Sequence, residues 1–372
     1  MLAIHITGHL LLLRGGGAPL PANWGHVYGS RIILALSTGG VGVPIFFVIS
    51  GFILSLPFAR HYLENASPPQ LGRYLRRRVT RIEPPYILAL TAMYLVYGAP
   101  RSLLPNYLAG LVYLHKIIFG TMNPVNIVTW SLEVEVFFYV LAPWLASVYR
   151  IQPAALRRVL LLLTIALSTY WTHYWLIPHG PPRFNYTLAS SITYFFAGML
   201  LTDLYVSGAL HLSQGPLQGI AWDVLAAGSG MALVYGAALN WRIQASAPFL
   251  IMLLFLGGMQ GWLFRWFLRL KLITVIGGMC YTLYLWHVLI LLWTGTWMMQ
   301  WVPPSLALGR ASLLYVCLMV PVIVISCAPL FYWIEKPFMN GPGSRYLERV
   351  IAKASTLLQR PARDRVSPGV LQ

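Results

Sequence analysis

Two histidines lie one helical turn apart near the start of the chain. His5 and His9 are spaced i, i+4, so on a helix their imidazoles share a face. Imidazole takes up and releases a proton near neutral pH, which makes either residue a candidate general base. Ile6 stands where the helix of a zinc protease carries its Glu, so the pair does not predict a metal site. The alternative for each histidine is a hydrogen-bonded contact between packed helices.

Two carboxylates follow in the segment TWSLEVEVFFYVLAP, residues 129–143. The chain has only nine acidic residues, so Glu133 and Glu135 within an apolar segment are candidates for function. Residues two positions apart on a helix point about 200° away from each other. We therefore expect at most one of them to serve a given site. The alternative is a Glu that pairs with a basic residue at the membrane surface.

An arginine cluster in RYLRRRVTRIEPPY consists of Arg73, Arg76, Arg77, Arg78 and Arg81. Arg78 and Arg81 are spaced i, i+3, so on a helix their guanidinium groups can hold one anionic group together. The alternative is a topology anchor that meets anionic lipid, worth about 1 kcal/mol per charge. The residues alone leave both interpretations open.

The composition indicates the surroundings of these residues. Of the 372 residues, 58% are hydrophobic and 9% are charged, and the mean hydropathy is +0.67. A soluble domain carries about 25% charged residues. We therefore predict an all-α fold, a polytopic bundle of about ten transmembrane helices. The net charge of +17 comes from basic residues at the ends of apolar blocks, which argues against a nucleic-acid partner.

Ten apolar segments are the expected spans, namely 2–14, 32–58, 84–99, 128–148, 157–177, 187–206, 221–240, 246–264, 274–298 and 310–334. With a cytoplasmic N-terminus, 19 of the 26 Lys and Arg residues lie on the inner side. We therefore expect both termini in the cytoplasm, a membrane domain over 1–337, and a cytoplasmic tail over 338–372 that is disordered in part. Segment 103–119 is expected to be an interfacial or re-entrant helix in an outer loop.

Some segments depart from a plain spanning helix. The first apolar run, Leu2–Leu13, has 12 residues, which is ~18 Å of helix against a ~30 Å hydrocarbon core. We therefore expect that a turn or two is missing at its N-terminal end. Gly51 favours close helix packing, and the spacing around Ser50 is not that of a Gly-x-Ser-x-Gly nucleophile. His287 carries the same two interpretations as the histidines of the first span.

Five pieces of sequence occur in order along nearly the whole chain, namely AIHITGHLL, FFVISGFIL, RRRVTRIEPPY, WSLEVEVFFYVLAP, and YTLYLWH with a terminal WIEKPF at 333–338. Together they resemble the acyltransferase 3 family of integral membrane O-acyltransferases. Members of that family pass acyl groups from cytoplasmic acyl-CoA to hydroxyls of glycans, lipids or natural products. The resemblance implies the same reaction here, with acetyl-CoA as the expected co-substrate and no metal.

The resemblance also implies the catalytic residues. His9 matches the family's essential His of the first span, with His5 as the second choice. Glu135 matches the Glu of the family's Trp-Ser-Leu-x-x-Glu segment, whereas Glu133 occupies the variable position. Glu135 would then hold the imidazole in one tautomer or stabilise its cation. An Arg that the family carries upstream of this His would fall before Met1.

The donor site is implied in the same way. Arg78 and Arg81 match the family's Arg-x-x-Arg pair on the cytoplasmic side, and with Arg77 they are expected to bind the phosphates of CoA. We thus expect an O-acyltransferase of the inner (plasma) membrane that acylates a glycan, a glycolipid or a sugar-bearing metabolite. Transfer would be direct, without a covalent acyl-enzyme. The alternatives are a transporter or flippase of an acylated glycan or lipid, and a family member that has lost activity.

Overall fold

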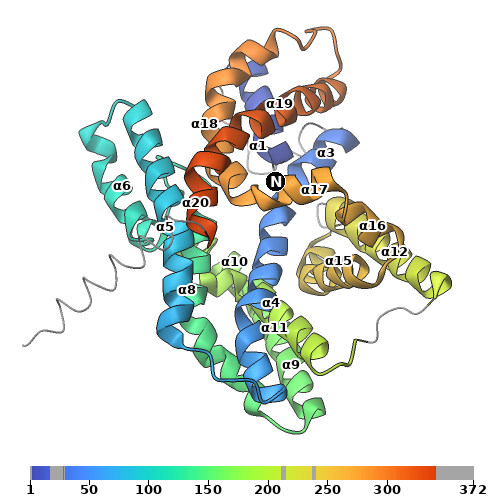
Figure 1. Cartoon of the computed structure of the whole chain (residues 1–372). Coiled ribbons are helices and arrows are strands. Elements are labelled where there is room, and N and C mark those ends of the chain that lie inside the picture. The colour runs from blue at the N-terminus through green and yellow to red at the C-terminus, as the bar shows by residue number, and fades with distance from the viewer. Residues whose placement is uncertain (1, 17–27, 29, 211–214, 237–239, 341–372) are drawn as a thin grey trace, which may run out of the picture.

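The computed structural model describes residues 2–16, 28, 30–210, 215–236 and 240–340. Within these residues the regular secondary structure is helical, without a strand (Figure 1). Seven helices of this part are long and apolar enough to cross a membrane, and Leu2–Arg14 and Ala247–Gln260 are shorter apolar helices. The prediction of an all-α polytopic bundle is therefore confirmed. Of the expected tail, 341–372 lies outside the described residues.

Each expected span coincides with helical structure over most of its length. In chain order the helices are α1 (Leu2–Arg14), α3 (Arg31–Ser37), α4 (Gly42–Leu63), α5 (Leu71–Val96), α6 (Leu104–Leu111), α7 (His115–Phe119), α8 (Trp130–Leu145), α9 (Ala154–Trp171), α10 (Ile177–His179), α11 (Leu188–Val206), α12 (Pro216–Met231), α14 (Trp241–Ala245), α15 (Ala247–Gln260), α16 (Leu263–Leu268), α17 (Lys271–Gly278), α18 (Cys280–Met299), α19 (Leu308–Leu330) and α20 (Lys336–Asn340).

Helix α5 begins earlier than the sequence indicated. The expected span began at Pro84, because two consecutive prolines are typical of a helix boundary. The helix instead runs from Leu71 to Val96 and contains both Pro84 and Pro85 in its interior. The arginine cluster and the apolar segment therefore form one continuous helix.

Two glycines bring α4 and α11 into backbone contact. A Cβ on Gly51 would collide with the carbonyl oxygen of Phe195, and a Cβ on Gly198 would collide with the carbonyl oxygen of Val48 and lie 2.6 Å from the amide nitrogen of Phe52. Small residues allow helices in a membrane to approach this closely. The expectation that Gly51 serves close packing is confirmed.

A buried ion cluster also holds α11, on the side of α9. Asp203 is fully buried and forms ion pairs with Arg157 and with Arg158, the latter at 2.7 Å. Arg157 also donates to the carbonyl oxygen of Ile151 at 2.7 Å. Because both arginines meet one carboxylate, the cluster satisfies a buried charge that would otherwise be costly.

Helix α1 packs against α3, α18 and α19, which gather in the upper part of Figure 1. At the end of α1, Arg14 donates to the carbonyl oxygens of Leu306 at 3.2 Å and Pro303 at 2.9 Å. These carbonyls belong to the loop between α18 and α19. The end of α1 is therefore fastened to that loop.

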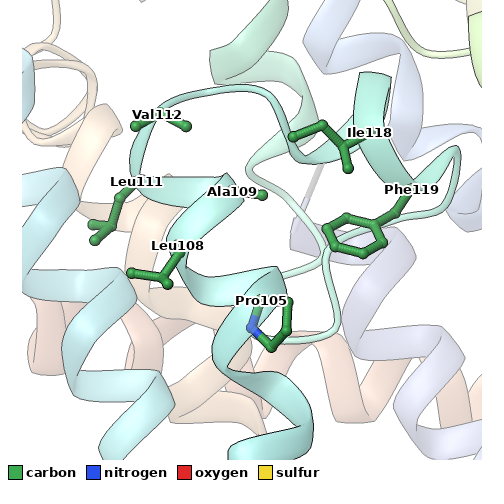
Figure 2. A pocket seen from close by; sticks show the side chains of 7 residues that line it. All are labelled: Pro105, Leu108, Ala109, Leu111, Val112, Ile118 and Phe119. Atoms are coloured by element: carbon green, nitrogen blue, oxygen red, sulfur yellow. The ribbon is translucent and has the colours of Figure 1, made fainter.

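Segment 103–119 contains the two short helices α6 and α7. Between them lies an open depression of about 480 Å³ (Figure 2), lined by Pro105, Leu108, Ala109, Leu111, Val112, Ile118 and Phe119. Its lining is apolar, and most of these side chains are exposed, which fits the expected interfacial segment. The depression contains none of the site residues expected from the sequence.

Candidate active site

The arginines of α5 differ in their surroundings. Arg73 and Arg77 are exposed, whereas Arg78 and Arg81 are half-buried. The guanidinium carbon of Arg78 lies 5.9 Å from the centre of the Tyr74 ring, a cation–π distance. The pair spaced i, i+3 thus faces the protein.

Glu335, from the WIEKPF piece, lies near Arg81. Its carboxylate is fully buried and accepts hydrogen bonds from the Thr282 amide at 3.0 Å and the Thr282 hydroxyl at 2.6 Å, at the first turn of α18. The charge of Arg81 acts on this carboxylate. Tyr281 donates to the carbonyl oxygen of Ile82 at 2.9 Å, which joins α18 to α5 at the same level. The WIEKPF piece therefore lies beside the arginine pair, where Glu335 bonds to the start of α18.

Glu135 lies inside a group of hydroxyl-bearing side chains. Its Oε1 accepts a hydrogen bond from the Ser50 hydroxyl at 2.7 Å. The charges of Glu135 and Arg78 both act on the hydroxyls of Tyr74 and Tyr139, so the carboxylate and the guanidinium face one polar interior. The tyrosines reached by the charge of Glu135 are Tyr74, Tyr113, Tyr139, Tyr281 and Tyr284.

Glu133 points elsewhere and organises α7. Its carboxylate is buried and accepts a hydrogen bond from the backbone amide of Lys116 at 2.9 Å. Burial lowers the pKa of the Lys116 amine, and the nearby Glu133 carboxylate acts in the opposite direction. Glu133 and Glu135 therefore serve different sites, as their spacing indicated.

His9 lies where α1, α18 and α19 meet. Its Nδ1 is 2.9 Å from the hydroxyl of Tyr315, and the two rings are nearly parallel, with centroids 6.2 Å apart. The backbone of Gly295 in α18 faces the imidazole, and a Cβ there would lie 2.5 Å from its Cε1. The imidazole is half-buried. Its partner is therefore a tyrosine.

His5 faces a different partner, one turn earlier. Its ring meets the ring of His287 edge-on, with centroids 5.0 Å apart. His287 is fully buried, and its Nδ1 lies 2.8 Å from the carbonyl oxygen of Tyr284 and 3.0 Å from that of Leu283. Because a carbonyl only accepts, Nδ1 carries the proton, and the buried Nε2 is left as an acceptor without a hydrogen bond among the described residues.

The candidate site has two parts, the group around Arg78 and Glu135 and the group around His9. Neighbouring side chains lie between the two parts, which do not contact each other directly in the described part of the chain. Among the described residues, no hydrogen bond or ion pair joins Glu135 to His9. Tyr284 bonds to Ser131 beside the Glu135 group, and its ring centre is 6.3 Å from that of His287. His287 in turn meets His5, which shares a helix face with His9. Polar side chains thus occupy the interior between the arginine end and His9.

Sequence reasoning did not identify Tyr315 or Gly295, and Tyr284 entered it only as part of the piece YTLYLWH. Each lies within an apolar block, where an aromatic ring or a glycine is an ordinary packing residue. Only the meeting of three helices far apart in the sequence shows that the Tyr315 hydroxyl and the bare backbone of Gly295 surround His9.

Comparisons with known proteins identify the family of the chain. Residues 1–332 match the family model described as an acyltransferase domain, which includes the matched positions of the histidine, arginine and carboxylate pieces. A stretch of 110 residues is 34% identical to the exopolysaccharide production protein ExoZ of Rhizobium meliloti (strain 1021), and it covers 27% of this chain and 32% of that protein. The similarity thus spans about a third of the relative's length. No solved structure matches the chain. The helical membrane fold and the match over most of its length show that the chain belongs to the acyltransferase 3 family of membrane acyltransferases.

Proposed function

We propose that the protein moves an acyl group, acetyl in the first instance, from cytoplasmic acyl-CoA to a hydroxyl of a glycan, a glycolipid or a sugar-bearing metabolite. The observation that carries this proposal is the polar interior between the arginine pair and His9. Ionisable and hydroxyl side chains are costly inside a membrane bundle and indicate function by default. The members of this interior are Arg78, Glu135, Tyr284, His287, His5 and His9.

The donor binds at the arginine end. CoA carries several phosphate charges, and guanidinium groups bind phosphate with two parallel hydrogen bonds. Arg78 and Arg81 are half-buried on one face of α5 and bind these phosphates, while the exposed Arg77 adds positive charge at the entrance. The thioester then extends into the polar interior.

His9 acts as the general base. Its imidazole takes the proton of the acceptor hydroxyl while that oxygen attacks the thioester carbonyl carbon. When the tetrahedral intermediate collapses, the C–S bond breaks, and the CoA thiolate takes the same proton from His9. The products are the acyl ester and free CoA, and no acyl-enzyme forms.

Glu135 acts on the donor side. Its carboxylate is bonded to Ser50, and its charge and that of Arg78 meet at the same tyrosine hydroxyls. Glu135 is half-buried, and its charge acts on the same tyrosine hydroxyls as the charge of Arg78, so the carboxylate favours an inward orientation of the guanidinium. We therefore assign Glu135 the role of orienting Arg78 and the thioester end of the donor. It does not orient the imidazole of His9.

The acceptor class is supported by the relative's name. ExoZ is described as an exopolysaccharide production protein, and part of it resembles part of this chain. A polysaccharide or its lipid-linked precursor offers many hydroxyls. A sugar hydroxyl is therefore the acceptor that we propose.

Inverted membrane vesicles with radiolabelled acetyl-CoA test the proposal on the acceptors that the membrane itself contains. Vesicles that contain the protein should release CoA thiol and form base-labile label on these endogenous acceptors. His9→Ala should lower the initial rate by about 100-fold or more, because general base catalysis contributes that much. His179→Ala, at an exposed histidine, is the matched control and should keep the full rate.

The outcomes separate the candidate functions. If His9→Ala keeps the full rate of transfer, His9 is not the general base. Movement of acylated material without CoA release favours a transporter or flippase. A wild-type chain that folds in the vesicles but releases no CoA above background is a member without this activity.

A further inference from the structure

Three helices converge on one atom of His9. The Nδ1 atom of this residue in α1 lies 2.9 Å from the Tyr315 hydroxyl in α19. The backbone of Gly295 in α18 closes the third side. The rings of His9 and Tyr315 are inclined by only 12°, so the imidazole lies alongside the phenol ring as well as bonded to it.

Gly295 provides the space for this arrangement. A Cβ on Gly295 would lie 2.5 Å from Cε1 of His9, 2.8 Å from its Nδ1 and 2.6 Å from the Tyr315 hydroxyl. Each distance is far shorter than a van der Waals contact, so any side chain at this position displaces the imidazole or the phenol. The position of His9 therefore depends on the absence of a side chain at residue 295.

The Tyr315 hydroxyl has one hydrogen bond among the described residues, the one to His9. Its side chain is fully buried, so a change of phenol to phenyl removes this bond and keeps the packed ring. A neutral imidazole has one nitrogen that donates and one that accepts. With Nδ1 bonded to Tyr315, Nε2 is the nitrogen left to meet a substrate.

We propose that Tyr315 is the positioning residue of His9 and that Gly295 is the space in which the pair fits. In the active form the Tyr315 oxygen accepts the hydrogen on Nδ1, so Nε2 carries no hydrogen and can take up a proton. When Nε2 takes the acceptor's proton, the imidazolium keeps its Nδ1 hydrogen bond and does not rotate before it returns the proton to the CoA thiolate. The inference rests on the proposed function, because it assumes that His9 is the base.

The test compares Tyr315→Phe with Tyr94→Phe in the vesicle assay with acetyl-CoA. Tyr94 is a matched control, since it is mostly buried in α5 and donates one hydrogen bond, to the carbonyl oxygen of Pro100 at 3.3 Å. Tyr315→Phe should lower kcat about 10- to 100-fold, the rate equivalent of one hydrogen bond to a charged group. The apparent KM for acetyl-CoA should stay unchanged, because the donor site is in another part of the bundle. Tyr94→Phe should keep kcat.

A second variant tests the same geometry independently of the Tyr315 ring. Gly295→Ala should lower kcat in the same way through displacement of His9, while Gly228→Ala, where a Cβ meets nothing within 4 Å, should not. An unchanged kcat in Tyr315→Phe overturns the inference. The inference is also overturned if the activity of Tyr315→Phe falls only in proportion to the amount of folded protein. A rise in its KM with an unchanged kcat would overturn it as well. If His9→Ala itself keeps full activity, the proposed function fails instead.

Discussion

Glu133 and Glu135 show how two identical groups acquire different roles. They lie two positions apart in α8, and the helix directs them to opposite sides. Glu133 is buried and bonds to the amide of Lys116, so it holds α7 in place. Glu135 bonds to Ser50 and shares its surroundings with Arg78. The Glu133 position therefore supports a neighbouring helix, whereas the Glu135 position faces the polar interior that contains Arg78.

The arginine pair gives a prediction at the same scale. Replacing Arg78 and Arg81 together with Ala should raise the apparent KM for acetyl-CoA about tenfold or more, because each guanidinium contributes charge-assisted hydrogen bonds to phosphate. The measurement is CoA release by inverted vesicles over a range of acetyl-CoA concentrations.

The same cluster supplies the control for that experiment. Arg73→Ala removes an exposed arginine and should leave KM within about twofold, since surface charges contribute little. If the Arg78 and Arg81 variant instead fails to insert while its KM in folded protein is normal, the pair is a topology anchor and not a phosphate site.

Between elements, glycines set the distances that the chemistry needs. Gly51 and Gly198 bring α4 and α11 into backbone contact, and Ser50, which holds Glu135, is the neighbour of Gly51. Gly295 instead leaves room in α18 for the side chains of His9 and Tyr315. Glu135 and His9 thus each lie near a glycine whose missing side chain lets neighbouring groups approach closely.

The contact between α4 and α11 can be tested by one methyl group. Gly198→Ala should lower the free energy of unfolding by about 1–3 kcal/mol, because the Cβ is forced against the backbone of α4. Gly228→Ala in α12 adds the same methyl group in open space and should be neutral or slightly stabilising. Thermal unfolding in detergent, followed by the loss of the monodisperse peak, measures both. Equal stability of the two variants would contradict the close contact.

Hydropathy predicted where helices would occur, because the period and length of apolar blocks are local properties. It did not predict that α5 continues through Pro84 and Pro85, because the prolines suggest a boundary, whereas the packing of α5 against α6, α18 and α20 is not a local property of the sequence. It also could not assign Tyr315 to His9, since the two residues are 306 positions apart. Glu135 was found from its segment, but its partner Ser50 was not.

For the whole molecule, contacts between helix ends agree with the expected alternation of the chain. Arg14, at the end of α1, bonds to the loop between α18 and α19. Arg150 donates to the Tyr62 hydroxyl at 2.9 Å, which joins the ends of two other helices expected on the opposite side. The ends that the distribution of Lys and Arg assigns to one side of the membrane are thus in contact with each other.

The orientation itself is a prediction from the positive charges. A fluorescent protein fused after Gln372 should fluoresce, and alkaline phosphatase fused there should be inactive, because both results require a cytoplasmic C-terminus. An epitope inserted beside Pro303 should be accessible in spheroplasts without permeabilisation. Active phosphatase at the C-terminus would reverse the orientation and remove the donor site from the side where acyl-CoA is present.

The two prolines inside α5 have a consequence for how the two sides communicate. Pro84 and Pro85 have no amide hydrogen, so the carbonyls of Thr80 and Arg81 one turn earlier lack their helical partners. This turn therefore lacks two of the hydrogen bonds that stiffen a helix, with the arginines on one side and Tyr86 on the other. Tyr86 bonds to the carbonyl oxygen of Gly110 in α6 at 2.7 Å. Any bend of α5 at this turn would therefore move the arginines relative to the segment that contains α6.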